Sequence, residues 1–229
     1  MFVHGAGGTS ASWDLQRLAF PAAVAVDLPG HRGEGPGRHR VEDYTAWVHT
    51  TVYEREWRPA VLAGHSMGGA IALTYALGHA LDLTAIVLVS TGARLRVLPA
   101  ILDGLRADHA GTVGRIITTC LAPEADPRLA RRLTEAMLAV PAEVTRGDFL
   151  ACDAFDVMAR LEAIRIPALV IGGREDRMTP PKFAEYLHAH LPDSRLVWVE
   201  GAGHMVHAER SRQVNEAIHQ FLIDLGLRG

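Results

Sequence analysis

The sequence is poor in cysteine and contains a single lysine, Lys182. Its two cysteines, Cys120 and Cys152, lie far apart and have no histidine cluster beside them. Zinc sites and disulfide scaffolds are built from closely spaced or numerous cysteines, so this pattern argues against both. We therefore expect neither a disulfide framework nor a bound metal.

The sequence also lacks an excess of charge and a long hydrophobic run. The net charge is −3 at pH 7 and the arginines are scattered, which indicates no general attraction to nucleic acid or to anionic membranes. No apolar stretch reaches transmembrane length. The first residues show no basic segment followed by a long apolar one, as a signal peptide would. We therefore expect a cytoplasmic protein whose partner is a small molecule.

The chain contains a regular alternation of strand-like and helix-like segments. Hydrophobic residues make up 48% of its 229 residues, enough for one domain with a large buried core. Strands are predicted over residues 2–3, 22–28, 60–63, 85–89, 168–171 and 195–199, and helices over residues 12–19, 41–55, 69–81, 180–190 and 212–225. Such alternation predicts a mostly parallel sheet covered by helices on both faces.

Residues 93–164 do not follow the alternation of strands and helices seen in the rest of the sequence. This stretch has no strand-like segment, and its amphipathic helical segments are separated by Pro99, Pro123, Pro127 and Pro141. We predict a helical insertion over 93–164, placed between two parts of an α/β core formed by residues 1–92 and 165–229. In open parallel sheets the binding crevice lies at the carboxyl ends of the strands, where we expect the insertion to sit.

Residues 64–68 read Gly-His-Ser-Met-Gly and join a strand-like stretch to a helix-like one. This G-x-S-x-G pattern is typical of a nucleophile elbow, a sharp turn that exposes a serine hydroxyl. A Cβ atom at position 64 or 68 would collide within such a turn, which explains Gly64 and Gly68. The alternative is an ordinary glycine-rich turn. The pattern makes Ser66 the candidate nucleophile.

A serine hydroxyl needs a base, and the base needs an acid to orient it. Asp176 follows the strand predicted at 168–171 and is the candidate acid, with Glu175 as its neighbouring alternative; Asp176 could instead only cap a turn. His204 follows the last predicted strand and is the candidate base. His207 is the alternative, although it falls where the next helix begins.

Two backbone N–H groups are needed to stabilise a developing oxyanion. One is expected from Met67, directly after Ser66, and the other from Ala6 in the glycine-rich loop after the first strand. His4, Gly5 and His65 flank this predicted site, and we expect them to support it rather than to react. The loop could alternatively cradle a phosphate, but it has no P-loop lysine.

At this point the sequence resembles proteins of the α/β-hydrolase fold. It is most similar to the small, cap-bearing branch that includes bacterial carboxylesterases, lactonases and C–C bond hydrolases. The matching segments span nearly the whole chain in family order: residues 4–8 with Trp13, residues 27–31, residues 64–69, residues 172–180, and residues 203–204 with Glu209.

The resemblance implies a Ser66–His204–Asp176 catalytic triad, oxyanion donors at Ala6 and Met67, and a helical cap over 93–164. Serine at the elbow separates this chain from relatives that carry aspartate there. Family members usually have two further strands before the His-Gly loop. We therefore expect a sheet reduced at one edge, or a truncated sequence, with the catalytic core retained.

The implied reaction is a two-step hydrolysis of carboxylic esters through an acyl-enzyme, which requires no cofactor. Aliphatic residues dominate the predicted cap, with Phe149 and Phe155 as its aromatics, so we expect a pocket for small to medium acyl chains. Arg94 and Arg96 are either contacts for a substrate carboxylate or ordinary surface residues.

Alternatives remain within and outside enzymes. The same triad would serve a lactonase, a C–C bond hydrolase, a thioesterase or a perhydrolase, because fold and triad do not determine the substrate. A ligand-binding receptor on a hydrolase scaffold is the non-enzyme alternative, which an intact triad disfavours. The oligomeric state is not readable from the sequence.

Overall fold

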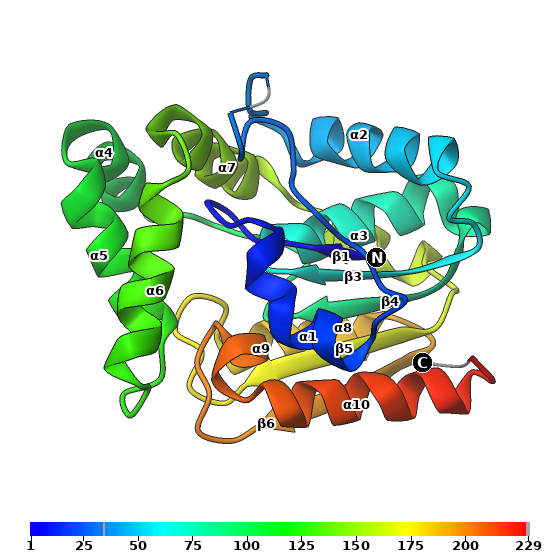
Figure 1. The fold of residues 1–229 in the computed structure, drawn as a ribbon. Coiled ribbons are helices and arrows are strands. Elements are labelled where there is room, and N and C mark those ends of the chain that lie inside the picture. Colours follow the sequence, from blue (N-terminus) through cyan, green and yellow to red (C-terminus); the bar gives the residue numbers. More distant parts are fainter. Residues whose placement is uncertain (34, 228–229) are drawn as a thin grey trace.

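A six-stranded, all-parallel sheet forms the centre of the molecule (Figure 1). The structure is a computed structural model that describes residues 1–33 and 35–227. In the order β2-β1-β3-β4-β5-β6, the strands are β2 (Ala25–Val26), β1 (Phe2–Val3), β3 (Ala60–His65), β4 (Leu83–Val89), β5 (Ala168–Gly173) and β6 (Ser194–Val199). This arrangement confirms the predicted α/β fold.

The pairing register brings the carboxyl ends of the strands to one edge. His65 on β3 lies opposite Val89 on β4, which lies opposite Ile171 on β5. Gly173, at the end of β5, pairs with Val199 at the end of β6. The segments that follow these strands therefore start side by side, although they are distant in sequence.

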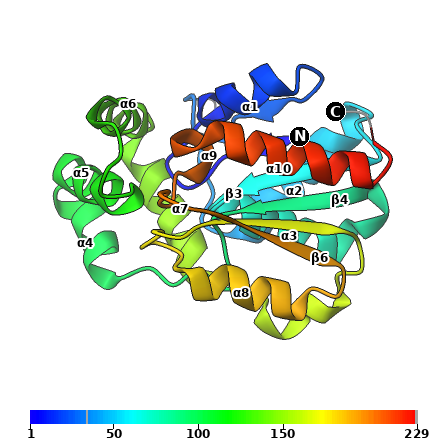
Figure 2. The same cartoon turned by 90° about the horizontal axis from the view of Figure 1, so that it is seen from below.

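Helices cover both faces of the sheet (Figure 2). One face carries α2 (Val41–Glu54), α3 (Met67–His79) and α8 (Pro181–His190), and the other carries α1 (Asp14–Ala19), α9 (Val206–Glu209) and α10 (Ser211–Asp224). Each face has its own buried apolar cluster, as expected for a sheet with alternating side-chain directions. In the described part of the chain, no helix has both the length and the hydrophobicity to cross a membrane.

One predicted strand is much shorter in the structure. The strand predicted at 22–28 is only Ala25–Val26, because β2 lies at the sheet edge and pairs with a single neighbour that is itself two residues long. That neighbour, β1, lies inside the sheet between β2 and β3. A short β1 thus still receives hydrogen bonds on both sides.

Four helices follow β4 and precede β5: α4 (Pro99–Ala107), α5 (His109–Cys120), α6 (Pro127–Leu138) and α7 (Ala142–Ala154). We call residues 93–164, all of which are described, the helical insertion. Proline at the first helical position starts α4 and α6, and Asp108 and Asp126 cap α5 and α6 through their side chains. Figure 1 shows α4, α5 and α6 beyond the carboxyl ends of the strands.

Candidate active site

Ser66 lies at the sharp turn between β3 and α3. Its φ of 53° and ψ of −115° fall in a region that non-glycine residues rarely adopt, so the turn holds a strained backbone. Two neighbours hold it there: the Ser66 N–H donates to the Val89 carbonyl at 3.0 Å, and the Thr91 hydroxyl donates to the Ser66 carbonyl at 2.7 Å.

The two glycines of the turn are required by close backbone contacts. A Cβ atom on Gly64 would lie 2.0 Å from the carbonyl oxygen of Gly68, so the expected collision within the turn is present. A Cβ atom on Gly68 would instead meet β1, 2.3 Å from the carbonyl oxygen of Val3. The second glycine therefore lets the start of α3 approach the strand that carries the first glycine-rich loop.

Asp176 is a buried carboxylate with four hydrogen bonds. Its Oδ1 accepts from the backbone N–H groups of Met178 and Thr179 at 2.8 Å, and its Oδ2 accepts from the Thr179 hydroxyl at 2.8 Å and pairs with His204 Nδ1 at 2.8 Å. Burial alone would raise the pKa of Asp176, but the charge and hydrogen bond of His204 and the bonds from Thr179 lower it. The alternative, Glu175, is exposed.

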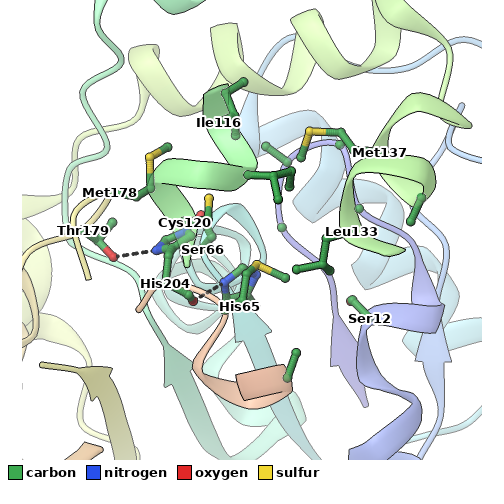
Figure 3. Close-up of a pocket in the computed structure, with 18 of the residues that line it drawn as sticks. Ser12, His65, Ser66, Ile116, Cys120, Leu133, Met137, Met178, Thr179 and His204 are labelled. Atoms are coloured by element: carbon green, nitrogen blue, oxygen red, sulfur yellow. Dashed lines mark hydrogen bonds between the residues drawn. The ribbon is translucent and has the colours of Figure 1, made fainter. Parts of the chain in front are cut away.

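His204 has one ring nitrogen directed at the acid. Because Nδ1 donates to Asp176, Nε2 carries a lone pair in the neutral ring, the form that a general base needs. Ser66 and His204 line the same cavity (Figure 3). No hydrogen bond joins their side chains, which are both described, and such bonds commonly tighten only when substrate is bound.

Thr179 is a residue that sequence reasoning missed. Its hydroxyl lies 2.8 Å from Asp176 Oδ2 and 3.2 Å from His204 Nδ1, so it faces both members of the pair. Figure 3 shows its contact with His204. A threonine three residues after an aspartate is a common turn pattern, which could have identified it.

The helical insertion is bonded to the loops that carry the acid and the base. The His204 N–H donates to the Cys120 carbonyl at 2.6 Å. Arg177, next to the acid, donates to the Thr118 carbonyl at 2.7 Å and to the Leu121 carbonyl at 3.1 Å. The end of α5 therefore helps to position both loops.

Glu209 on α9 also links the insertion to the loop that carries His204. Its two carboxylate oxygens accept from the Ala122 N–H at 2.9 Å and the Gly203 N–H at 3.0 Å. Burial raises the pKa of Glu209, although these two bonds oppose the shift. A single carboxylate thus fastens the segment before His204 to the insertion.

The candidate oxyanion donors are brought to the same edge. In the loop after β1, the Gly7 N–H donates to Asp148 Oδ2 at 2.8 Å and the Gly8 N–H donates to the Gly5 carbonyl at 3.0 Å. Within residues 1–33 and 35–227, the N–H groups of Ala6 and Met67 donate to no other protein group. Met67 also begins α3, where the helix dipole favours negative charge.

The flanking histidines are neutral supports. His4 Nδ1 donates to the Gly5 carbonyl at 2.9 Å while Nε2 accepts from the Leu28 N–H at 3.0 Å, and burial lowers the pKa of His4 to about 4. His65 Nε2 donates to the His204 carbonyl at 3.0 Å (Figure 3), and burial lowers its pKa well below the ordinary value. A Cβ atom on Gly5 would lie 2.8 Å from His65 Nδ1.

His207, the alternative base, lies behind the site. Its ring packs 4.5 Å from the Trp13 ring and 4.4 Å from the His65 ring, and it is fully buried. Its ring nitrogens have no hydrogen-bond partner among the described residues, and burial lowers its pKa to about 3. His207 does not line the cavity, so it acts as a packing residue.

The cavity next to Ser66 has a volume of about 480 Å³ and mostly apolar walls. The insertion contributes Leu95, Val97, Ile116, Ile117, Leu133, Ala136, Met137 and Phe149 to these walls. Cys120 and Cys152 are free thiols in the lining, and burial raises the pKa of both. The walls agree with the expected aliphatic pocket.

Three expectations about the pocket are refined. Phe155 does not line it; it packs in the core between insertion and sheet, and Phe183 of α8 lines the cavity instead. Arg94 lies outside the lining and pairs with Asp156 at 3.7 Å, so it is a surface residue. Arg96 does line the cavity.

One group of side chains in the described residues could hold a metal ion. The donor atoms of His49, His79 and Asp82 all lie within 4.8 Å of one another. Asp82 already accepts a hydrogen bond from the Tyr75 hydroxyl at 3.2 Å and pairs with Arg58 at 3.5 Å. This group lies on α2 and around the end of α3 and contributes nothing to the cavity.

Comparison with known proteins agrees with this architecture. The sequence matches the model of the alpha/beta hydrolase family over residues 1–217. It is 30% identical over 227 residues to a pimeloyl-[acyl-carrier protein] methyl ester esterase of Neisseria meningitidis serogroup C / serotype 2a, covering 90% of this chain and 88% of that protein.

Solved structures give the same result. A thermophilic esterase superposes with a TM-score of 0.88 at 33% identity, covering 98% of this chain and 89% of its own. An enol-lactonase from Burkholderia xenovorans LB400 superposes with a TM-score of 0.88 at 23% identity, covering 97% and 90%, and this likeness concerns the fold alone. With the family match and the Ser66 turn, these findings show that the chain belongs to the alpha/beta hydrolase family.

Proposed function

We propose that this protein is a serine hydrolase of carboxylic esters that acts through Ser66, His204 and Asp176. The observation that carries the proposal is the 2.8 Å bond between buried Asp176 and His204, with His204 and the strained Ser66 in one cavity. Two relatives that resemble the chain over most of its length are named as esterases, which supports the same activity.

The reaction proceeds in two steps. His204 Nε2 accepts the Ser66 proton as the hydroxyl oxygen attacks the ester carbonyl carbon. The N–H groups of Ala6 and Met67 donate to the oxyanion that forms. His204 then protonates the departing alcohol, and an acyl-enzyme remains. Water attacks this second ester while His204 takes its proton, and the acid leaves as Ser66 is restored.

Asp176 determines which nitrogen of His204 is available. Its carboxylate accepts from Nδ1 and stabilises the imidazolium that forms during each attack. The hydrogen bonds from Thr179 keep the carboxylate ionised and oriented. The strained Ser66 turn keeps the hydroxyl at the cavity.

The substrate is an ester of small to medium acyl length. A mostly apolar cavity of about 480 Å³ accommodates a short aliphatic acyl chain, although its lining also includes Arg96 and Arg132. The helical insertion supplies most of its walls, so we assign it the role of a cap over 93–164. The same catalytic groups would also hydrolyse a lactone or a thioester.

Replacement of Ser66 tests the proposal. We expect Ser66→Ala to lower kcat for p-nitrophenyl butyrate by about 10⁴-fold or more, because no other group supplies the nucleophile. The variant should also fail to react with a fluorophosphonate probe. Ser211→Ala, at the start of α10, is the matched control and should keep both properties.

The outcome separates the alternatives. A correctly folded Ser66→Ala protein that keeps most of its turnover would remove Ser66 from the mechanism. A wild-type protein that binds esters and never turns them over would be the receptor alternative. A panel of esters, lactones and thioesters on the wild-type protein ranks the remaining hydrolase activities.

A further inference from the structure

Asp148 is a fully buried carboxylate on α7 of the helical insertion, and the reaction described above does not use it. Its Oδ2 accepts from the Gly7 N–H at 2.8 Å and pairs with His31 Nε2 at 2.8 Å. Its Oδ1 accepts from the Tyr44 hydroxyl at 2.5 Å. One side chain therefore joins the insertion to the first glycine-rich loop and to two further elements of the core.

The hydrogen bonds of His31 show that it is charged. Its Nδ1 lies 3.0 Å from the Leu28 carbonyl and 3.2 Å from the Pro29 carbonyl, so Nδ1 carries a proton. Its Nε2 faces the Asp148 carboxylate, another acceptor, and needs a proton as well. Burial would lower the pKa of His31, but the bond and charge of Asp148 raise it. The two form a buried ion pair.

The Ala6 N–H belongs to the Gly5–Ala6 peptide, and both this peptide and the following Ala6–Gly7 peptide are held by hydrogen bonds. The Gly5 carbonyl accepts from the Gly8 N–H at 3.0 Å and from His4 Nδ1 at 2.9 Å. Because a trans peptide directs its N–H opposite to its carbonyl, these bonds aim the Ala6 N–H the other way. The next peptide is held through its own N–H, that of Gly7, by Asp148.

We propose that Asp148 is a positioning residue for the oxyanion site, acting from the insertion on the Ala6–Gly7 peptide. Gly7 has a φ of 63°, a conformation that glycine adopts freely, so the loop needs an external contact to keep it. Because its acceptor is the Asp148 carboxylate, which is paired with His31, the hydrogen bond from the Gly7 N–H is charge-assisted and therefore stronger. This inference rests on the proposed function, since it concerns the donor at Ala6.

The test uses a background in which the ion pair is already removed. In His31→Leu, replacing Asp148 leaves no uncompensated buried imidazolium, which would destabilise the fold. The two variants to compare are His31→Leu/Asp148→Leu and His31→Leu/Asp148→Asn. Their side chains at 148 have similar volume, and only the second offers Gly7 an oxygen acceptor.

We expect the Asp148→Leu double variant to have a kcat about 10- to 100-fold below that of the Asp148→Asn double variant, the range for partners that orient a reacting group, with KM nearly unchanged. The Asp148→Asn double variant should keep a kcat near that of the wild type, because its amide oxygen still accepts from Gly7. Affinity for a trifluoromethyl ketone, which forms an oxyanion on Ser66, should fall in parallel with kcat because it depends on the same donors.

Tyr44→Phe is the matched control, since it removes the hydrogen bond to Asp148 Oδ1 and leaves the Gly7 N–H bonded to Oδ2. It should lower the melting temperature and leave kcat within about twofold, because the lost hydroxyl bonds Asp148 and the Arg38 backbone and not Gly7. Equal kcat and inhibitor affinity in the Leu and Asn double variants would overturn the inference. If Ser66→Ala keeps its activity, the proposed function fails instead.

Discussion

Single residues hold Ser66, the proposed nucleophile, in a conformation that the backbone would otherwise avoid. Ser66 has a positive φ, and close contacts at Gly64 and Gly68 leave no space for a side chain. Gly68 touches β1, so it also sets the distance between the serine and the loop that carries Ala6. The strain at the turn is maintained by contacts with neighbours rather than by local preference.

Gly68→Ala and Gly78→Ala form a matched pair on α3. The added methyl at 68 would lie 2.3 Å from the Val3 carbonyl, whereas at 78 it meets nothing within 4 Å. We expect Gly68→Ala to lower the free energy of unfolding by about 3 kcal/mol, at the upper end for overpacking, and to lower kcat. Gly78→Ala should raise the free energy of unfolding by up to about 1 kcal/mol. Urea unfolding measures both; equal effects would refute the steric argument.

At the scale of elements, the helical insertion forms most of the cavity and also holds the catalytic loops. α5 is bonded to the segments around His204 and Arg177, and α7 is bonded to Gly7. If the proposed function holds, we expect the insertion to influence which substrate enters and how Ser66 and His204 are oriented. Substitutions in its walls should alter selectivity more than the chemical step.

Leu133 on α6 lines the cavity (Figure 3), while Leu138 on the same helix is exposed. We expect Leu133→Phe to shift the preference in a p-nitrophenyl ester series towards shorter acyl chains, because the larger ring shortens the pocket. For the longest accepted chain, kcat/KM should fall about tenfold or more. Leu138→Phe should leave the series unchanged, and a shift in that variant alone would contradict this assignment.

At the scale of the whole molecule, buried neutral histidines should make stability depend on pH. Burial lowers the pKa of His4 to about 4 and of His207 to about 3, from an ordinary 6.5, and lowers that of His65 strongly. Below pH 6.5 the unfolded chain therefore binds protons that the folded chain does not. The free energy of unfolding consequently decreases as the pH is lowered. His31, with its raised pKa, acts in the opposite direction.

We expect the free energy of unfolding to decrease between pH 6.5 and pH 5, with each buried histidine contributing about 1.4 kcal/mol per pH unit once the unfolded side chain is protonated. His207→Phe should reduce the slope by one such contribution, because it removes one proton site from the unfolded state. Urea unfolding at several pH values measures this, and an unchanged slope in the variant would be inconsistent with a buried neutral His207.

Much of the fold and part of the candidate site followed from local patterns. Alternating strand and helix periodicity predicted the α/β architecture, and the glycines around Ser66 predicted the turn, because both depend on neighbouring residues along the chain. The short edge strand β2 was predicted too long, since its length depends on how many residues its partner β1 can offer. Of the two aromatics in residues 93–164, Phe149 lines the cavity and Phe155 packs in the core, a difference that the residue type alone does not reveal.

By itself, the sequence determined the residue types, the strained turn and the order of strands and helices along the chain. Only the tertiary structure decided which distant groups meet: Thr179 with His204, Glu209 with Ala122, and Asp148 with Gly7 across 141 positions. The physical reason is the distance along the chain over which each effect acts. Periodicity and steric strain act within a few residues, whereas a hydrogen bond between loops depends on how the sheet brings its strand ends together.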